Sequence, residues 1–154
     1  MKLLLLVAAI GLAFYLYSSS QARRQAGENM RMGDQFLQEN RGKPGIYETD
    51  SGLQYEVLHE SEGPQPQAGN RVKVHYEGRL LDGTVFDSSY ARGEPISFGL
   101  NQVIPGWTEG LQLMHQGEKM RLFIPARLGY GERSAGKIPP GSLLIFDVEL
   151  LGIE

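Results

Sequence analysis

The stretch from residue 71 to residue 80 limits the fold more narrowly than any other part of the sequence, because polar and apolar side chains alternate along it. Val72, Val74 and Tyr76 fall on one side of an extended chain, with charged residues or histidine between them. This period of two predicts a β-strand with one face on a core and the other in water. A one-sided strand of this kind is typical of antiparallel sheets.

Further strand patterns lie on both sides of this segment. An Asp-Gly pair at 82–83 is typical of a two-residue hairpin turn, so residues 84–87 are predicted to return antiparallel to 71–80. In another predicted strand, Phe123 falls on the polar side together with Arg121. The remaining predicted strands cover residues 53–57, 96–98, 119–124 and 143–151, and a long glycine-rich and proline-rich loop occupies 126–142.

A single short helix is predicted between two of these strands. Pro105 and Gly106 end an extended segment, and Trp107, Leu111 and Met114 then follow at helical spacing. In the simplest interpretation, the only tryptophan is a core residue where a helix packs on a sheet. Four or more antiparallel strands and one inserted helix predict an α+β fold, with the helix against the concave side of a twisted sheet.

The N-terminal segment has a different character. Residues 3–17 form an uncharged apolar run of about 15 residues, shorter than the roughly 20 that cross a bilayer comfortably. Small residues at Ser20 and Ala22 favour cleavage by a signal peptidase, whereas Tyr15 and Tyr17 favour retention as an interfacial anchor. We expect a membrane-directed segment, either a signal peptide or a signal anchor, with retention favoured.

The division of the chain follows its composition. Residues 1–22 hold this leader. Residues 23–51 are polar and contain several glycines, which predicts a polar spacer with one short helix over 28–40. Apolar alternation begins beyond the spacer, so residues 52–154 are predicted to form the folded domain.

Composition excludes several classes of function. The formal net charge of −3 lacks the basic surface that nucleic acid requires. There is no cysteine to act as a nucleophile or metal ligand, and His59, His75 and His115 are too scattered to bind a metal. No serine lies in a nucleophile-elbow motif, so we expect no covalent intermediate and no cofactor.

Aromatic residues gather at predicted strand ends and loop bases. They are Tyr76, Phe86, Phe98, Trp107, Tyr130 and Phe146. An apolar pocket with a few polar groups at its rim is the usual site for a small ligand, and Asp87 and two tyrosine hydroxyls could form that rim. The alternative for Asp87, which begins an Asp-Ser-Ser segment, is a purely local Asx-type turn.

Three strings of this sequence resemble the FKBP-type, macrolide-binding peptidyl-prolyl cis-trans isomerases. They are Val-His-Tyr-Glu-Gly-Arg-Leu-Leu-Asp-Gly-Thr-Val-Phe-Asp-Ser-Ser (74–89), Val-Ile-Pro-Gly-Trp (103–107) and Ile-Pro-Pro-Gly-Ser-Leu-Leu-Ile-Phe-Asp-Val-Glu-Leu-Leu (138–151). The similarity extends from about Gly52 to Glu154, with the motifs in family order. The lead-in at 49–55 resembles Mip-like bacterial members that carry an N-terminal extension.

The resemblance implies a half-barrel sheet wrapped around the helix, and it assigns roles in the pocket. Trp107 would be the floor under a proline ring, Asp87 would lie beside the reacting amide, and the Tyr130 hydroxyl would lie near the substrate carbonyl. The implied catalytic residues are Asp87, Tyr130, Tyr76 and Phe86. The implied substrate-binding residues are Trp107, Val103, Ile104, Phe146, Ile138, Ile96, Phe98 and Arg92, with the Ile104 backbone N–H as a further donor.

The implied activity is isomerisation of X-Pro bonds during protein folding, by noncovalent binding and without metal or cofactor. The implied partners are proline-containing unfolded or nascent polypeptides, with macrolides of the tacrolimus type as inhibitors. Lys137 stands where single-domain human-type members carry an apolar residue. The leader adds the expectation of a membrane-anchored or exported protein, at a bacterial inner membrane and facing the periplasm. The alternative is a membrane-tethered holdase that uses the same pocket without turnover.

Overall fold

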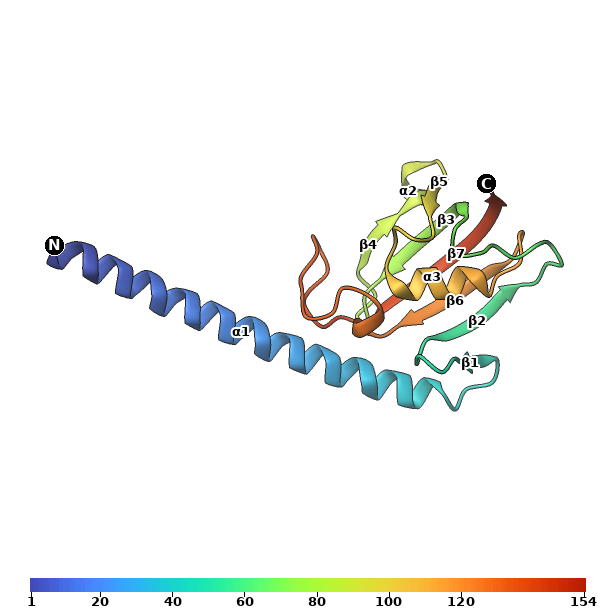
Figure 1. The fold of residues 1–154 in the computed structure, drawn as a ribbon. Helices are drawn as coiled ribbons and strands as arrows, with labels where there is room; N and C mark the ends of the chain where they lie inside the picture. Colours follow the sequence, from blue (N-terminus) through green and yellow to red (C-terminus); the bar gives the residue numbers. More distant parts are fainter.

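The computed structural model describes residues 1–154 as a seven-stranded antiparallel sheet with helices around it (Figure 1). The strands are β1 (Ile46–Glu48), β2 (Gln54–His59), β3 (Arg71–Arg79), β4 (Val85–Ser88), β5 (Ile96–Gly99), β6 (Lys119–Ile124) and β7 (Leu144–Ile153). The helices are α1 (Lys2–Asn40), α2 (Ser89–Arg92) and α3 (Pro105–Gln112), with a 3-10 turn at Ala126–Leu128. The predicted α+β fold is confirmed, and only β1 and α2 have no counterpart among the predicted elements.

The sheet runs in the order β1-β2-β6-β7-β3-β4, and β5 also pairs with β3. The predicted hairpin after β3 is present, and Gly78 pairs with Asp87. Its loop is one residue longer than predicted, because the Leu80 N–H donates to the Thr84 carbonyl oxygen and leaves residues 81–83 as the loop, with Gly83 at a φ of 90°. Two strands therefore share one side of β3, with β5 beside residues 71–74 and β4 beside residues 77–79. This arrangement leaves a gap in the ladder at His75 and Tyr76, and the gap shapes the site described below.

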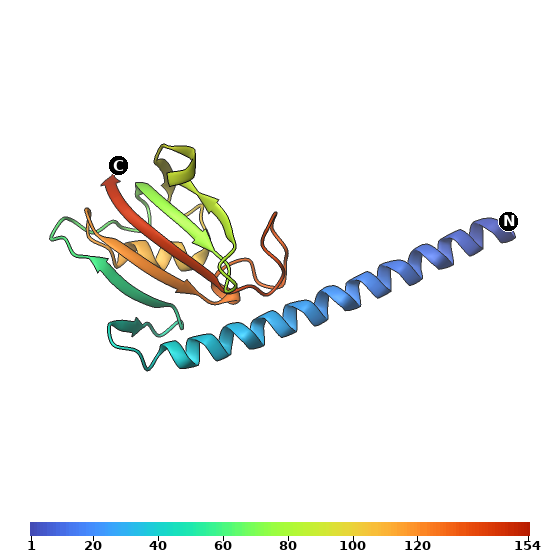
Figure 2. The ribbon, with the colours of Figure 1, turned by 180° about the vertical axis from the view of Figure 1, so that it is seen from behind.

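The core lies between α3 and the concave face of the sheet (Figure 1). Trp107, Leu111 and Met114 are all buried there, as their helical spacing predicts. Two glycines bring the helix close to β6. A Cβ atom at Gly106 would lie 2.5 Å from Ile124, and one at Gly110 would lie 2.8 Å from the Leu122 side chain. Seen from behind in Figure 2, the strands lie in front and α3 lies beyond them.

The outer face of the sheet differs from the prediction at Phe123, which is only 5% exposed. The alternation of side chains assigned Phe123 to the correct face of the sheet, but solvent does not reach the part of that face where Phe123 lies. The last turns of α1 cover it, with the Phe36 and Phe123 ring centroids 5.8 Å apart and Leu37 and Leu143 buried beside them. An exposed phenylalanine would forfeit the free energy of apolar burial, and a second layer recovers it.

α1 runs unbroken from Lys2 to Asn40, so the short helix predicted over 28–40 is the C-terminal part of a longer one. Its buried residues are Ala26, Gly33, Leu37 and Asn40, which share one helical face. Asn29 also donates a hydrogen bond of 2.8 Å to the carbonyl oxygen of Pro140. The few apolar and small residues of this segment are thus enough to dock it on the domain. The sequence alone had indicated an undocked spacer.

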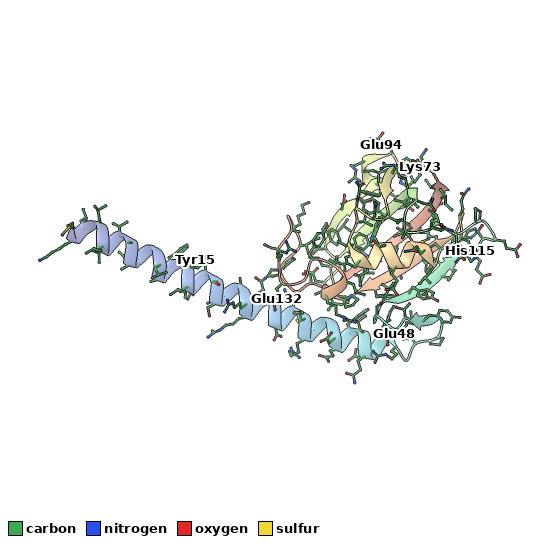
Figure 3. The ribbon with its side chains drawn as sticks, in the orientation of Figure 1. Tyr15, Glu48, Lys73, Glu94, His115 and Glu132 are labelled. Carbon is green, nitrogen blue, oxygen red and sulfur yellow. The ribbon has the colours of Figure 1, made fainter.

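The N-terminal half of α1 extends away from the domain, as both ribbon views show (Figure 2). Tyr15 lies on this projecting part (Figure 3). The helix is long and apolar enough to cross a membrane, and no residue of its most apolar window is buried. A signal sequence has the same properties, so both readings of residues 3–17 agree with this geometry.

One ion-pair cluster supports the outer face, and it leads to a prediction about stability. Asp147 of β7 accepts hydrogen bonds from the Arg121 guanidinium at 2.7 and 3.1 Å, with Arg79 3.5 Å away. Burial raises the pKa of Asp147, but these cations outweigh burial and hold the pKa below its ordinary value. The folded state therefore favours the charged form, which stabilises the fold above the unfolded-state pKa near 3.9.

We expect Asp147→Asn to lower the free energy of unfolding by about 1–3 kcal/mol at pH 7, because it leaves Arg121 without its partner. The difference from wild type should shrink as the pH falls through the folded-state pKa of Asp147, where the carboxylate is lost anyway. Urea unfolding between pH 7 and pH 2 measures both effects. The control is Asp50→Asn, because Asp50 is exposed and makes no ion pair. A loss of unfolding free energy in Asp147→Asn that does not change with pH would contradict this account.

Candidate active site

A pocket of about 700 Å³ opens between α3, the sheet and the loop after β6. Ten of its 14 lining residues are hydrophobic. They come from six separate parts of the chain, which meet only in the folded protein. The lining residues are Tyr76, Phe86, Asp87, Phe98, Gln102, Val103, Ile104, Trp107, Tyr130, Ala135, Gly136, Lys137, Ile138 and Phe146.

Trp107 forms the floor of the pocket at the first turn of α3, where Pro105 starts the helix. Three rings stand edge-on to the indole: Tyr76, Phe98 and Phe146 have centroids 5.1, 5.5 and 5.3 Å away, all at more than 80°. Edge-to-face contacts of this kind are favourable and directional, so they fix the ring planes. The result is a rigid, flat, apolar surface at the bottom of the pocket.

Gly78 makes room for one wall of this pocket. The rings of Phe86 and Phe146 meet edge-on beside it, with centroids 5.4 Å apart. A Cβ atom at Gly78 would lie 2.5 Å from the Phe86 ring and 2.7 Å from the Phe146 ring. Both rings can therefore lie directly over the backbone of β3 only because this residue has no side chain.

The gap in the ladder beside β3 brings Asp87 to the pocket. At the gap, Ser89 of α2 replaces the missing strand: its Oγ accepts a hydrogen bond of 2.7 Å from the Tyr76 N–H. Ser88 caps α2 by accepting a hydrogen bond of 3.2 Å from the Ala91 N–H. Because these two serines satisfy the local backbone, the chain leaves the sheet here and the Asp87 carboxylate is free to face the pocket. The local capping role considered for Asp87 belongs to Ser88.

The Asp87 carboxylate is held by two donors. One oxygen accepts a hydrogen bond from the Tyr76 hydroxyl, and the other forms an ion pair with Arg92. Burial raises the pKa of Asp87, but the hydrogen bonds from Tyr76 and Arg92 outweigh it and leave this pKa below its ordinary value. Burial and the bond to Asp87 raise the pKa of Tyr76, so the hydroxyl keeps its proton. Arg92 also lies 3.2 Å from the Tyr76 hydroxyl and 5.8 Å from its ring centroid.

Several hydrogen-bond donors at the pocket have no partner within the chain, among them the indole N–H of Trp107. The backbone N–H of Ile104, just before α3, donates to no group. The Tyr130 hydroxyl makes no hydrogen bond either, and this residue is 42% exposed at the mouth of the pocket. Because donors near an apolar floor are costly to leave unpaired, they can bind the carbonyl groups of a ligand seated on Trp107.

The loop between β6 and β7, residues 125–143, forms the remaining wall and is called the flap loop below. Ala135 and Ile138 exchange two backbone hydrogen bonds of 2.9 Å each, so residues 135–138 make a tight hairpin. Ile138 is 6% exposed and lines the pocket. The base of the loop rests on α1 through Pro140, as described above. This long loop is thus ordered, and it carries a pocket wall as well as a link to α1.

The structure brings ten of the twelve predicted site residues to the pocket wall. The two exceptions are Arg92, which reaches the site through Asp87 and Tyr76, and Ile96, which does not line the pocket. Ile96 lies about 7 Å from Phe98 along β5, at an exposed edge of the sheet. Four further lining residues, Gln102, Ala135, Gly136 and Lys137, were not among the predicted site residues. Their only sequence signal is proximity to Val103 and to the flap residue Ile138.

The sequence model described as FKBP-type peptidyl-prolyl cis-trans isomerase matches residues 63–151, and the model of the domain amino terminal to it matches residues 10–57. The chain is 53% identical over 137 residues to the FKBP-type isomerase FkpA of Aeromonas hydrophila, covering 89% of this chain and 51% of that protein. It is 55% identical over 133 residues to the 22 kDa FKBP-type isomerase of Escherichia coli K12, with coverage of 85% and 65%.

A third relative, the outer membrane protein MIP of Legionella longbeachae, is 46% identical over 137 residues, with coverage of 88% of this chain and 59% of that protein. The chain thus spans about half to two thirds of the length of these curated relatives.

Solved structures agree with the sequence comparison. The crystal structure of FkpA from Escherichia coli has a TM-score of 0.92 at 38% identity, covering 96% of this chain and 70% of that chain. The peptidyl-prolyl isomerase of Pseudomonas syringae pv. tomato has a TM-score of 0.77 at 39% identity, with coverage of 83% and 95%. By the match of more than half of its residues and by this shared architecture, the chain belongs to the FKBP-type peptidyl-prolyl cis-trans isomerase family.

Proposed function

We propose that this protein catalyses cis-trans isomerisation of X-Pro peptide bonds in unfolded or nascent polypeptides, by noncovalent binding in the pocket over Trp107. The observation that carries the proposal is the rigid aromatic floor together with unpaired donors at the mouth. A proline ring is apolar and compact, and it fits a flat indole surface. The carbonyl groups that flank it need donors, which Ile104 and Tyr130 can supply.

The physical obstacle is amide resonance. Rotation about an X-Pro bond crosses a barrier of about 18–20 kcal/mol and takes about 10–100 s without a catalyst. The planar amide has more charge separation than the twisted transition state. A dry apolar pocket therefore disfavours the planar form more than the twisted one, which lowers the barrier.

The polar groups add differential binding to this effect. The Asp87 carboxylate, oriented by Tyr76 and Arg92, would lie beside the reacting amide. The Ile104 N–H and the Tyr130 hydroxyl would hold the carbonyl groups on either side of the proline. Contacts that strengthen as the amide twists raise the rate, whereas contacts that are equal in both states only tighten binding.

The test is cis-to-trans isomerisation of an X-Pro peptide by the full chain, with and without tacrolimus. We expect acceleration that the macrolide blocks, because both ligands would occupy the same pocket. A folded protein that binds tacrolimus but accelerates no peptide would overturn the isomerase proposal. It would leave a membrane-tethered binding module as the working function.

Tyr130→Phe separates the hydroxyl from the ring. We expect kcat/KM to fall about three- to tenfold, since one hydrogen bond to the substrate carbonyl is lost. Stability should stay within about 0.5 kcal/mol of wild type, because the hydroxyl has no partner in the free protein. Tyr47, which lies exposed on the far edge strand β1, offers a matched control as Tyr47→Phe. Equal activity of Tyr130→Phe and wild type would remove the hydroxyl from the mechanism.

The exposed apolar part of α1 bears on location. We propose that residues 3–17 tether the protein to a bacterial inner membrane, with the isomerase domain on the periplasmic side. Support comes from the length and hydropathy of this segment and from the aromatic residues at its end. Digestion of spheroplasts and of inverted inner-membrane vesicles with a protease tests the proposal. Loss of the domain only from the inverted vesicles would place it on the opposite side and overturn the proposed orientation.

A further inference from the structure

We propose that Lys137 gives the pocket a preference for X-Pro segments that carry an acidic residue directly before or after the proline. This inference rests on the isomerase function proposed above and adds a substrate class to it. Lys137 is the only lysine or arginine among the residues that line the pocket. The inference follows from where the backbone fixes this residue and from the charges around it.

The backbone holds Lys137 at the mouth of the pocket. It is the second central residue of the two-residue turn between Ala135 and Ile138, and both backbone hydrogen bonds of that turn are 2.9 Å long. Gly136 takes the first central position with a φ of 56°, a conformation that glycine adopts without strain. Ile138 anchors the turn by its buried side chain. The Lys137 side chain is therefore exposed, while its backbone is held in a fixed position at the mouth of the pocket.

The charge of Lys137 is not balanced by the protein. It forms no ion pair and no hydrogen bond with another residue. Asp87 is the only carboxylate that lines the pocket, and Arg92 neutralises it through a close ion pair. The mouth of the pocket thus carries one unpaired positive charge on a protein whose formal net charge is −3. A carboxylate on a segment bound in the pocket would find an unpaired cation in the pocket lining here.

The expected size of the effect follows from exposure. An ion pair in contact with water contributes about 0.2–1 kcal/mol, which corresponds to a preference of roughly 1.4- to fivefold. The preference should decline as salt is added, because exposed charges are screened. The overall negative charge of the chain would work against acidic peptides, so a preference for them has to come from a local cation.

The experiment compares isomerisation of matched peptides by the full chain. One pair places Glu or Gln before the proline, a second pair places Glu or Gln after it, and a Leu-Pro peptide serves as the reference. For wild type we expect the Glu-to-Gln ratio of kcat/KM to be about 1.4 to five in at least one pair at low salt. Lys137→Gln should bring this ratio to about one, and Lys137→Arg should retain it.

Arg133→Gln is the matched control, since Arg133 lies exposed on the same loop and does not line the pocket. It should leave the ratio as in wild type. A wild-type ratio of one in both pairs, with the Leu-Pro peptide accelerated, would overturn the inference and leave the isomerase function intact. A ratio that survives in Lys137→Gln would overturn the assignment to this residue. If no peptide is accelerated at all, the proposed function itself fails, and this inference fails with it.

Discussion

Replacing Gly78 with valine is expected to lower the free energy of unfolding by about 2–3 kcal/mol and to reduce isomerase activity at least about tenfold. A Cβ atom at this position would lie 2.5 Å from the Phe86 ring and 2.7 Å from the Phe146 ring, closer than real contacts allow. Both rings would have to turn away from β3. They form one wall of the pocket and hold the Trp107 floor, so the change affects stability and the site together.

Gly152→Val is the matched control for this prediction. Gly152 lies in β7, the strand that pairs with β3, and the nearest atom to a new Cβ would be the Lys73 Cβ at 3.9 Å. Valine favours extended backbone, so this variant should be as stable as wild type or slightly more stable. Urea unfolding and peptide isomerisation measure the two effects. If Gly78→Val and Gly152→Val behave alike, the glycine has no special role in making room for the aromatic wall.

Asp87→Leu should reduce kcat/KM about ten- to a hundredfold, which corresponds to about 1.4–2.7 kcal/mol in activation free energy. The leucine removes the negative charge beside the reacting amide. It also releases the Tyr76 hydroxyl and the Arg92 guanidinium, which Asp87 holds in place. The Asp87 side chain is 39% exposed, so the fold should survive the change. Stopped-flow isomerisation and a thermal melt separate lost activity from lost structure.

Asp87→Asn and the pH dependence sharpen this prediction. Asparagine keeps an acceptor for Tyr76 but removes the charge, so a loss equal to that of Asp87→Leu would identify the charge as the essential feature. The pKa of Asp87 lies below its ordinary value, so wild-type activity should stay level from neutral pH down to about pH 5. It should decline only as the pH falls through that lowered pKa. Full activity of a folded Asp87→Leu variant would remove the carboxylate from the mechanism.

α1 connects the apolar N-terminal segment to the pocket in one rigid element. The docked part of α1 contacts the base of the flap loop, where Asn29 donates a hydrogen bond to Pro140. Ile138, two residues before Pro140 in the sequence, lines the pocket. Gly33 allows the helix to approach Leu143, because a Cβ atom there would already lie 3.2 Å from the Leu143 Cβ. A structural link between the helix and the pocket is thus present in the free protein.

Local periodicity was sufficient to predict β2 to β7 and α3, but not the short strand β1. The alternation over 71–80 assigned Val72, Val74 and Tyr76 to the core side, and all three are buried. The Asp-Gly pair correctly predicted that β4 returns antiparallel to β3, but the loop has three residues, 81–83, and the register shifts after Gly78, which the pair alone did not predict. The family strings then assigned ten pocket residues that the fold brings together.

Other features depend on contacts between distant segments, which no local pattern contains. The alternation of apolar and polar side chains along β6 predicts that Phe123 faces solvent, and only the docking of α1 removes it from water. The position of Asp87 depends on Ser89, which bonds to β3 where two strands leave a gap. The ion pair of Asp87 with Arg92 likewise joins residues whose pairing no local pattern predicts.

The sequence by itself determined where β2 to β7 and α3 lie and which of their residues face the core, since these follow from side-chain spacing along one segment. The tertiary structure alone decided which outer residues a second layer covers, which donors stay unpaired and which charge at the pocket is not balanced. The physical reason is that burial, hydrogen bonding and Coulomb energy depend on distances in space. Those distances are set only when α1, the sheet and the flap loop have packed together.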